Sequence, residues 1–135
     1  MKLLLDTHVI IWAITDDERL STDARTIILD RNNIIYYSLV SMWEIAIKNF
    51  KNPKKCPYNE IKIANYCDKA GYEAVNISLS HISQLRKLRI MTEKELNNND
   101  PFDRLLLAQA KTEGMLLLTH DCNFDNYNEP CIMKI

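Results

Sequence analysis

The chain has 135 residues, 47% hydrophobic and 26% charged, which is the balance of a globular protein with one domain over residues 1–135 and excludes a disordered chain. With only two glycines, Gly71 and Gly114, it lacks the Gly-rich loop that cradles nucleotide phosphates. Lysine and arginine number 17 against 18 aspartates and glutamates, so the net charge of −1 gives no overall attraction for nucleic acid, and such a partner must be held by a local patch.

The cysteines and the apolar segments indicate the compartment. The 4 cysteines have no metal-binding spacing and form no dense framework, which favours a reduced, cytoplasmic environment. The longest apolar run, Val9 to Ile14, is far below the ~20 residues of a membrane span, and Leu3 to Leu5 is too short for a signal peptide. We expect a protein that is neither exported nor inserted into a membrane.

In chain order, short apolar segments alternate with helical ones. Strands are expected over Lys2 to Leu5, Ile34 to Tyr37, Glu73 to Ile77, Met115 to Leu118 and Cys131 to Met133. Helices are expected over Thr7 to Ile14, Thr22 to Arg31, a segment through Trp43 and Ile47, Asn59 to Ala70, a segment through Leu85 and Leu88, and Asp100 to Glu113. This alternation predicts a three-layer α/β/α sandwich with a central, mainly parallel sheet.

Capping residues mark the ends of these helices. The expected N-caps are Ser21, Ser38 or Ser41, Ser80, and Asp100 with a proline after it, and the expected ends are Gly71 and Gly114. Lys51 to Pro57 is expected to be a loop, and the cluster Asn97 to Asn99 a turn.

Acidic residues follow two of the expected strands. Asp6 comes directly after Leu5, and Asp121 comes three residues after Leu118. Carboxyl ends of parallel strands meet at one edge of the sheet, where ligands bind near the point at which the strand order reverses. Asp103, in the first turn of its helix, faces the same edge. Glu44 is the only acid of an apolar helix, where a buried carboxylate needs a partner.

Each of these acids also has a purely structural interpretation. Asp6 suits a helix cap, Asp103 suits the third position of a capped helix, and Asp121 suits an Asx-turn. Glu44 suits an ion pair with Lys48, one helical turn further on. Taken singly, none of the four acids indicates catalysis.

Taken together, the four acids indicate a metal site. Carboxylates about 5 Å apart repel by about 3 kcal/mol per pair at an effective dielectric constant near 20, so a cluster of four needs protons or a cation. Oxygen ligands without cysteine or histidine at zinc spacing favour Mg²⁺ or Mn²⁺. Such an ion orients a phosphodiester and activates the attacking water. The set therefore predicts metal-assisted hydrolysis of phosphodiesters.

Three segments carry a family resemblance. LLLDTHVIIWAI, SLVSMWEIAIKNFK and NDPFDRLLLAQAKTEGMLLLTHDCNF occur in this order and, with the tail, resemble a PIN domain, in particular the VapC-like ribonuclease toxins of toxin–antitoxin systems. The resemblance implies RNA cleavage at a Mg²⁺ or Mn²⁺ site, a homodimer and a cognate antitoxin. By position it implies that the catalytic and metal-binding residues are Asp6, Glu44, Asp103 and Asp121, supported by the hydroxyls of Thr7 and Thr119.

Basic and aromatic residues suggest partner surfaces. Lys48 and Lys51 belong to a cluster that suits either a solvated helix end or a patch that follows RNA phosphates. Arg104, beside the third acid, suits a phosphate or a neighbouring carboxylate. The apolar faces near Trp12 and Trp43 are candidates for an antitoxin groove.

The leading hypothesis is thus a Mg²⁺- or Mn²⁺-dependent endoribonuclease in one PIN-like nuclease domain, the toxin of a toxin–antitoxin pair. The alternative is a PIN-fold module that binds RNA or a partner without cutting. A receiver-like phosphotransfer domain needs an acceptor aspartate after a central strand, and here Ser38 follows Ile34 to Tyr37.

Overall fold

The computed structural model describes residues 1–89 and 100–135, in which five parallel strands form one sheet in the order β3-β2-β1-β4-β5. The strands are β1 (Lys2–Leu5), β2 (Ile34–Ser38), β3 (Glu73–Val75), β4 (Leu116–Thr119) and β5 (Ile132–Lys134). The α-helices are α1 (Thr7–Ile14), α2 (Thr22–Leu29), α3 (Leu39–Lys51), α4 (Glu60–Lys69), α5 (Leu79–Gln84) and α6 (Pro101–Glu113), with 3₁₀ helices η1 (Leu85–Lys87) and η3 (Cys122–Asn126).

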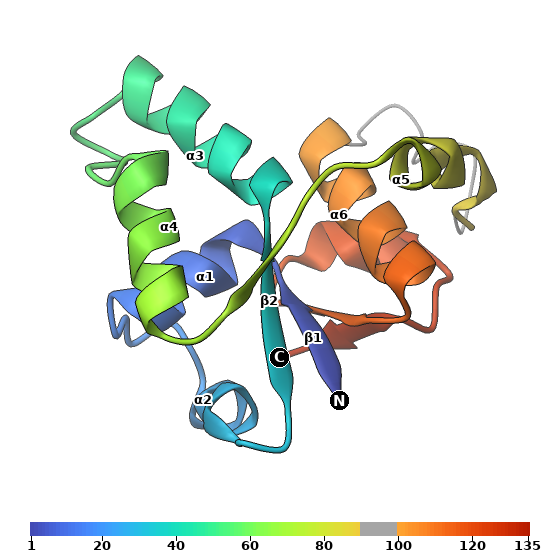
Figure 1. Ribbon diagram of the computed structural model, residues 1–135, viewed down its shortest axis with the longest axis horizontal. Coiled ribbons are helices and arrows are strands. Elements are labelled where there is room, and N and C mark those ends of the chain that lie inside the picture. The colour runs from blue at the N-terminus through green and yellow to red at the C-terminus, as the bar shows by residue number, and fades with distance from the viewer. Residues whose placement is uncertain (90–99) are drawn as a thin grey trace.

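Helices cover both faces of the sheet. In Figure 1, α1 and α4 lie on one side of the strands, and α5 and α6 lie on the other. Strand β1 shows the cause, because Leu3 and Leu5 are buried in the core under α1, α2, α3 and α4, whereas Leu4 is buried in the core under α6. A strand that is apolar on both sides needs a layer on each. The predicted three-layer α/β/α sandwich is confirmed.

The helix starts show which polar side chains act as caps. Ser21, Ser38 and Asp100 accept hydrogen bonds from backbone N–H groups at the starts of α2, α3 and α6, which confirms Ser21 and Asp100 and selects Ser38 over Ser41. The prediction that Ser80 caps a helix through Leu85 and Leu88 is wrong. Ser78 caps α5, because its hydroxyl accepts from the backbone N–H of His81 while Nδ1 of His81 accepts from the backbone N–H of Ser78.

The other differences concern element ends. Helix α2 ends at Leu29, two residues before the expected Arg31, and β3 ends at Val75 and not at Ile77. Strands β4 and β5 each begin and end one residue later than expected. Helix α3 includes Lys51, so the loop begins at residue 52. The expected turn at 97–99 lies outside the described residues. In the part of the chain described here, no helix has the length and apolar character needed to cross a bilayer.

Helix α6 ends at a residue that needs a left-handed backbone. Gly114 has φ +67° and its N–H donates to the carbonyl of Ala110. We expect Gly114→Ala to lower the free energy of unfolding by about 1 kcal/mol, because a Cβ strains this conformation although it meets no neighbouring atom. Urea denaturation measures the loss, with Thr112→Ala on the exposed face of the same helix as the control. An unchanged denaturation midpoint for Gly114→Ala would contradict the prediction.

Candidate functional site

The site lies where the strand order reverses. Strand β1 neighbours β2 on one side and β4 on the other, so the chain changes direction across the sheet between β1 and β4. Asp6 directly follows β1, and its N–H donates to the carbonyl of Leu118 in β4 over 3.0 Å. Thr119 ends β4, and Asp121 follows two residues later. Crevices at such reversal points are the common ligand sites of open parallel sheets.

The Asp6 carboxylate is buried and held by two donors. Its Oδ1 accepts from the backbone N–H of Thr7 over 2.7 Å, and its Oδ2 accepts from Oγ1 of Thr119 over 2.8 Å. The Thr119 hydroxyl also accepts from the backbone N–H of Asp121 over 3.0 Å, so it joins two of the predicted acids. The hydroxyl of Thr7 donates to Oγ of Ser41 and not to a carboxylate. Burial raises the pKa of Asp6, and its hydrogen bonds oppose that rise.

Glu44 lies in the second turn of α3, which starts at the carboxyl end of β2. Its Oε2 accepts from Nζ of Lys48 at 2.9 Å, so the predicted ion pair within the helix is present. Its Oε1 is buried and has no hydrogen-bond partner among the described residues. A buried carboxylate oxygen without a donor is costly, and a cation or a proton at this position removes that cost.

Asp103 lies in the first turn of α6, where Asp100 is the cap. Oδ1 of Asp100 accepts from the backbone N–H of Phe102 over 2.8 Å, which accounts for Asp100 without a catalytic role. Burial raises the pKa of Asp103 to about 8, and the charges of Asp6, Asp100, Asp121 and Glu44 add to the rise. The other three predicted acids are thus near enough to affect Asp103, and two of them, Asp6 and Asp121, are joined through hydrogen bonds to Thr119.

The donor chemistry suits a hard divalent cation. The four acids offer carboxylate oxygens, the ligands of Mg²⁺ and Mn²⁺, and the unpaired Oε1 of Glu44 is the observation that favours a cation here. The side chains do not form a finished ligand cage, since within residues 1–89 and 100–135 no three His, Cys, Asp or Glu side chains are placed to hold one ion. Two of the four carboxylates are held by other partners, Glu44 by Lys48 and Asp6 by Thr119.

Asp121 and the basic residues have other local contacts. Oδ1 of Asp121 accepts from the backbone N–H of Asn123 over 2.9 Å, which is the Asx-type cap of η3. Nη2 of Arg104 donates to the carbonyl of Leu85 over 3.2 Å, so this guanidinium links α6 to the segment after α5. Lys51 is exposed at the end of α3.

Sequence reasoning missed a buried polar network behind the site. Oγ of Ser38 donates to Oε1 of Gln109 in α6, and Nε2 of Gln109 lies 3.4 Å from Nδ1 of His81. Since that nitrogen accepts from Ser78, Nε2 of His81 carries the proton and donates to Glu113 over 2.8 Å. The network ties α3, which carries Glu44, to α6, which carries Asp103. The available signal was a glutamine between two alanines on an apolar helix face.

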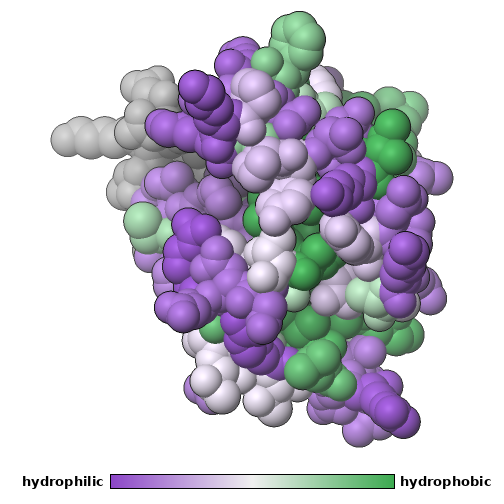
Figure 2. Space-filling model, turned by 90° about the vertical axis from the view of Figure 1, so that its left-hand side faces the viewer, coloured by the Kyte–Doolittle hydropathy of each residue, from purple (hydrophilic) through white to green (hydrophobic). Residues whose placement is uncertain are grey.

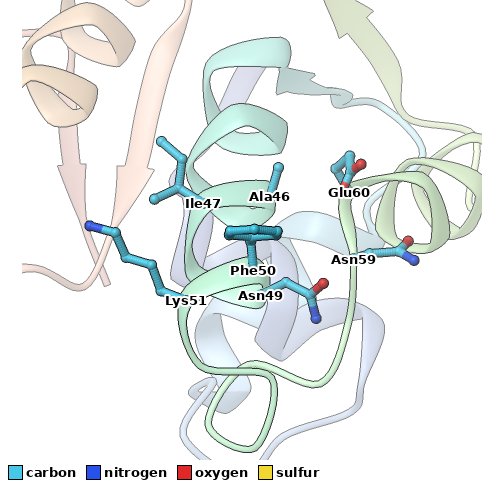
Figure 3. Close-up of a pocket in the computed structure, with 7 residues that line it drawn as sticks. All are labelled: Ala46, Ile47, Asn49, Phe50, Lys51, Asn59 and Glu60. Carbon is cyan, nitrogen blue, oxygen red and sulfur yellow. The ribbon is translucent and has the colours of Figure 1, made fainter.

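A hollow away from the acids lies between the end of α3 and the start of α4. It has a volume of about 620 Å³, and Phe50, which is 90% exposed, stands at its centre (Figure 3). Lys51 extends away from Asn59 and Glu60 in this view. The face of the molecule around α3 and α4 shows apolar surface between hydrophilic areas (Figure 2). Exposed apolar surface of this kind suits a protein partner.

The fold and the site thus define a class of protein: a parallel α/β domain with several carboxylates near the point where the strand order reverses. Residues 3–130 match the PIN domain family, and the chain belongs to that family. No curated protein matches the sequence.

Solved structures of toxin–antitoxin complexes have a similar fold. VapBC2 from Rickettsia felis, bound to a DNA fragment from its promoter, is 21% identical over 100% of this chain and 98% of that chain, with a TM-score of 0.69. DNA-bound VapBC from Salmonella typhimurium is 15% identical over 99% and 98%, with a TM-score of 0.68. A toxin–antitoxin complex from Klebsiella pneumoniae is 17% identical over 98% and 99%, with a TM-score of 0.60. At these identities the likeness establishes the fold.

Proposed function

We propose that the protein is a Mg²⁺- or Mn²⁺-dependent endoribonuclease in which Asp6, Glu44, Asp103 and Asp121 hold the metal and are the catalytic residues. The observation that carries this proposal is the buried Oε1 of Glu44, which has no hydrogen-bond partner among the described residues. Burial and the charges of the other acids also raise the pKa of Asp103. A divalent cation bound by these carboxylates would offset both costs.

The chain's own residues set up the chemistry. A bound ion supplies orientation of the phosphodiester, a lowered pKa for the attacking water and charge stabilisation on the leaving oxygen. Thr119 fixes the orientation of the Asp6 carboxylate through the 2.8 Å hydrogen bond to Oδ2. Thr7 holds the other oxygen through its backbone N–H, and its hydroxyl fixes α1 against Ser41 of α3. Lys48 compensates the charge of Glu44 in the metal-free protein through the ion pair at 2.9 Å.

We further propose that this nuclease is the toxin of a toxin–antitoxin pair, that it works in the cytoplasm as a homodimer, and that a cognate antitoxin inhibits it. The similarity to VapBC complexes supports the antitoxin. Surface composition supports a protein interface, because Leu39, Trp43 and Phe50 lie on one face of α3 with exposed fractions of 40%, 56% and 90%. The 4 cysteines are free thiols, in keeping with a reducing compartment.

Cleavage of a panel of tRNA and rRNA fragments tests the proposed activity. We expect fragments to accumulate with Mn²⁺ or Mg²⁺ and to disappear in excess EDTA, because the carboxylates alone activate no water. Protein with Asp6→Asn, purified identically, controls for contaminating ribonucleases and is expected to be inactive. Cleavage that survives EDTA would contradict the proposal, and RNA retention in a gel shift without cleavage at any metal concentration would favour the non-cleaving module.

A further inference from the structure

A groove rich in cations lies beside the carboxylate cluster. It has a volume of about 430 Å³, and no acid is among the residues that line it. We call it the basic groove and define it by six of its lining residues: His8, Trp12, Arg19, Lys48, Lys51 and Lys55. They come from α1, the loop after it, the end of α3 and the loop that follows. Two of these cations are in ion pairs, Arg19 with Asp17 and Lys48 with Glu44, and Lys51 and Lys55 add two further positive charges to the groove.

The basic groove opens onto the acids. Lys48, one of its walls, holds Oε2 of Glu44 at 2.9 Å. His8, which also lines the groove, lies in the first turn of α1 and follows Asp6 by two residues. Lys48 therefore links the groove to Glu44, one of the proposed metal ligands.

Aromatic rings form part of the same groove. The ring of His8 stacks on Trp12 with centroids 6.0 Å apart, and the guanidinium of Arg19 lies 5.2 Å from the Trp12 ring centroid. Trp12 is buried, whereas His8 is exposed and extends this aromatic surface to solvent. A second hollow of about 310 Å³ shares Arg19 and Lys55 with the basic groove and is also lined by Asp17 and Tyr58.

We infer that the basic groove binds the single-stranded RNA segment adjacent to the scissile phosphodiester. Lys51 and Lys55 contact its phosphates, and a base stacks on His8. Arg19, whose guanidinium is paired with Asp17 at 2.7 Å, holds the Trp12 side of the groove. Surfaces that bind single-stranded nucleic acid combine a cationic track with aromatic rings, and both are present here. An acidic protein segment needs the cations alone and leaves the stacked rings without a role. The inference rests on the proposed function, since it names where the substrate of that site lies.

Removing two groove lysines tests the phosphate contacts. Fluorescence anisotropy measures binding of a fluorescein-labelled ten-nucleotide single-stranded RNA in EDTA, so that neither metal nor cleavage is involved. We expect Lys51→Ala with Lys55→Ala to weaken binding roughly tenfold at moderate salt and to reduce the slope of log K against log salt by about 1.4, that is about 0.7 for each lost phosphate contact. The matched control, Lys54→Ala with Lys69→Ala, removes two exposed lysines outside the groove and is expected to change neither value substantially.

A second pair of variants tests the stacking contact. His8→Ala is expected to weaken RNA binding roughly fivefold, and His8→Phe, which keeps a ring, is expected to restore it. Crosslinking of RNA that contains 4-thiouridine is expected to modify peptides from residues 7–15 or 48–58. Crosslinks confined to other peptides would overturn the inference, as would equal losses of affinity in the groove and control lysine variants.

Two further outcomes separate the inference from its rivals. If polyglutamate displaces RNA as well as unlabelled RNA does, and the groove variants lose affinity for polyglutamate alone, the groove belongs to an acidic protein segment and the inference fails. If the groove variants lose RNA affinity but the wild-type protein cleaves nothing with Mn²⁺, the binding site stands and the proposed nuclease fails. RNA binding measured without metal thus tests the groove, and RNA cleavage measured with metal tests the proposed nuclease activity.

Discussion

Asp103→Asn is expected to abolish RNA cleavage and at the same time to stabilise the metal-free protein. Asparagine keeps the shape of the side chain but removes the carboxylate that a divalent cation needs, and we expect cleavage to fall by at least about a hundredfold. It also removes a buried carboxyl group whose pKa burial and the neighbouring acids raise to about 8, so that folding near neutral pH no longer requires this group to take up a proton. We therefore expect the free energy of unfolding in EDTA to increase by about 1–3 kcal/mol.

Single-turnover cleavage with Mn²⁺ and thermal unfolding in EDTA measure the two effects of Asp103→Asn. The matched control is Asp100→Asn, three residues earlier, because asparagine caps a helix as well as aspartate does and the α6 N-cap is kept. This control is expected to retain cleavage within several-fold of the wild type. Loss of activity in Asp100→Asn but not in Asp103→Asn would reverse the assignment of the third acid.

The metal-free protein is expected to be less stable at about pH 8.5 than at about pH 6. The pKa of Asp103 rises to about 8 in the folded protein and the pKa of Asp6 is also raised, both from a value of 3.8. At a pH between 3.8 and about 8, Asp103 keeps in the folded protein a proton that it has released in the unfolded chain. The free energy of unfolding therefore falls as the pH rises through this window, and we expect the melting temperature to drop by roughly 5–10 °C.

Divalent cations are expected to counteract this loss. Mg²⁺ and Mn²⁺ bind deprotonated carboxylates, so their stabilising effect is expected to be larger at the higher pH. Thermal unfolding with Mn²⁺ or EDTA at both pH values measures the difference, and Asp103→Asn is expected to remove most of the pH dependence in EDTA. A metal-free melting temperature that rises between the two pH values would contradict the clustered, partly protonated acids.

Much of this molecule could be predicted from local sequence. The short apolar segments at Lys2 to Leu5 and Met115 to Leu118 favour strands buried on both faces. The structure confirms the first and places the second one residue later, at Leu116–Thr119. Asp100 followed by proline and Gly114 at the other end bound α6 because caps act within a few residues. The start of α5 was mispredicted, because both Ser78 and Ser80 are plausible N-caps. Only the contact of His81 with Ser78, which completes the capping box, distinguishes them.

For the candidate site, local sequence predicted the positions of some acids but not the function of each. Asp6 and Asp121 follow apolar strands, so their position at the carboxyl edge was predictable from the pattern of the chain. Each acid alone also suits a cap or an ion pair, so the prediction of a metal site came from the four acids taken together, and the family resemblance then assigned each acid its position in the site. For Glu44 the predicted ion pair with Lys48 is present, and its other, buried oxygen has no hydrogen-bond donor within the part of the chain that the structure describes.

By itself, then, the amino-acid sequence determined the layers of the fold and which acids lie at the carboxyl edge of the sheet, because alternation of apolar segments and capping are local properties. Only the tertiary structure decided the strand order, which reverses between β1 and β4. It also decided the hydrogen-bonded network from Ser38 through Gln109 to His81, and it placed Trp12, Arg19 and Lys55 around one groove. These features join residues far apart in the chain. Their proximity depends on how the helices pack across the sheet, and no local pattern encodes that packing.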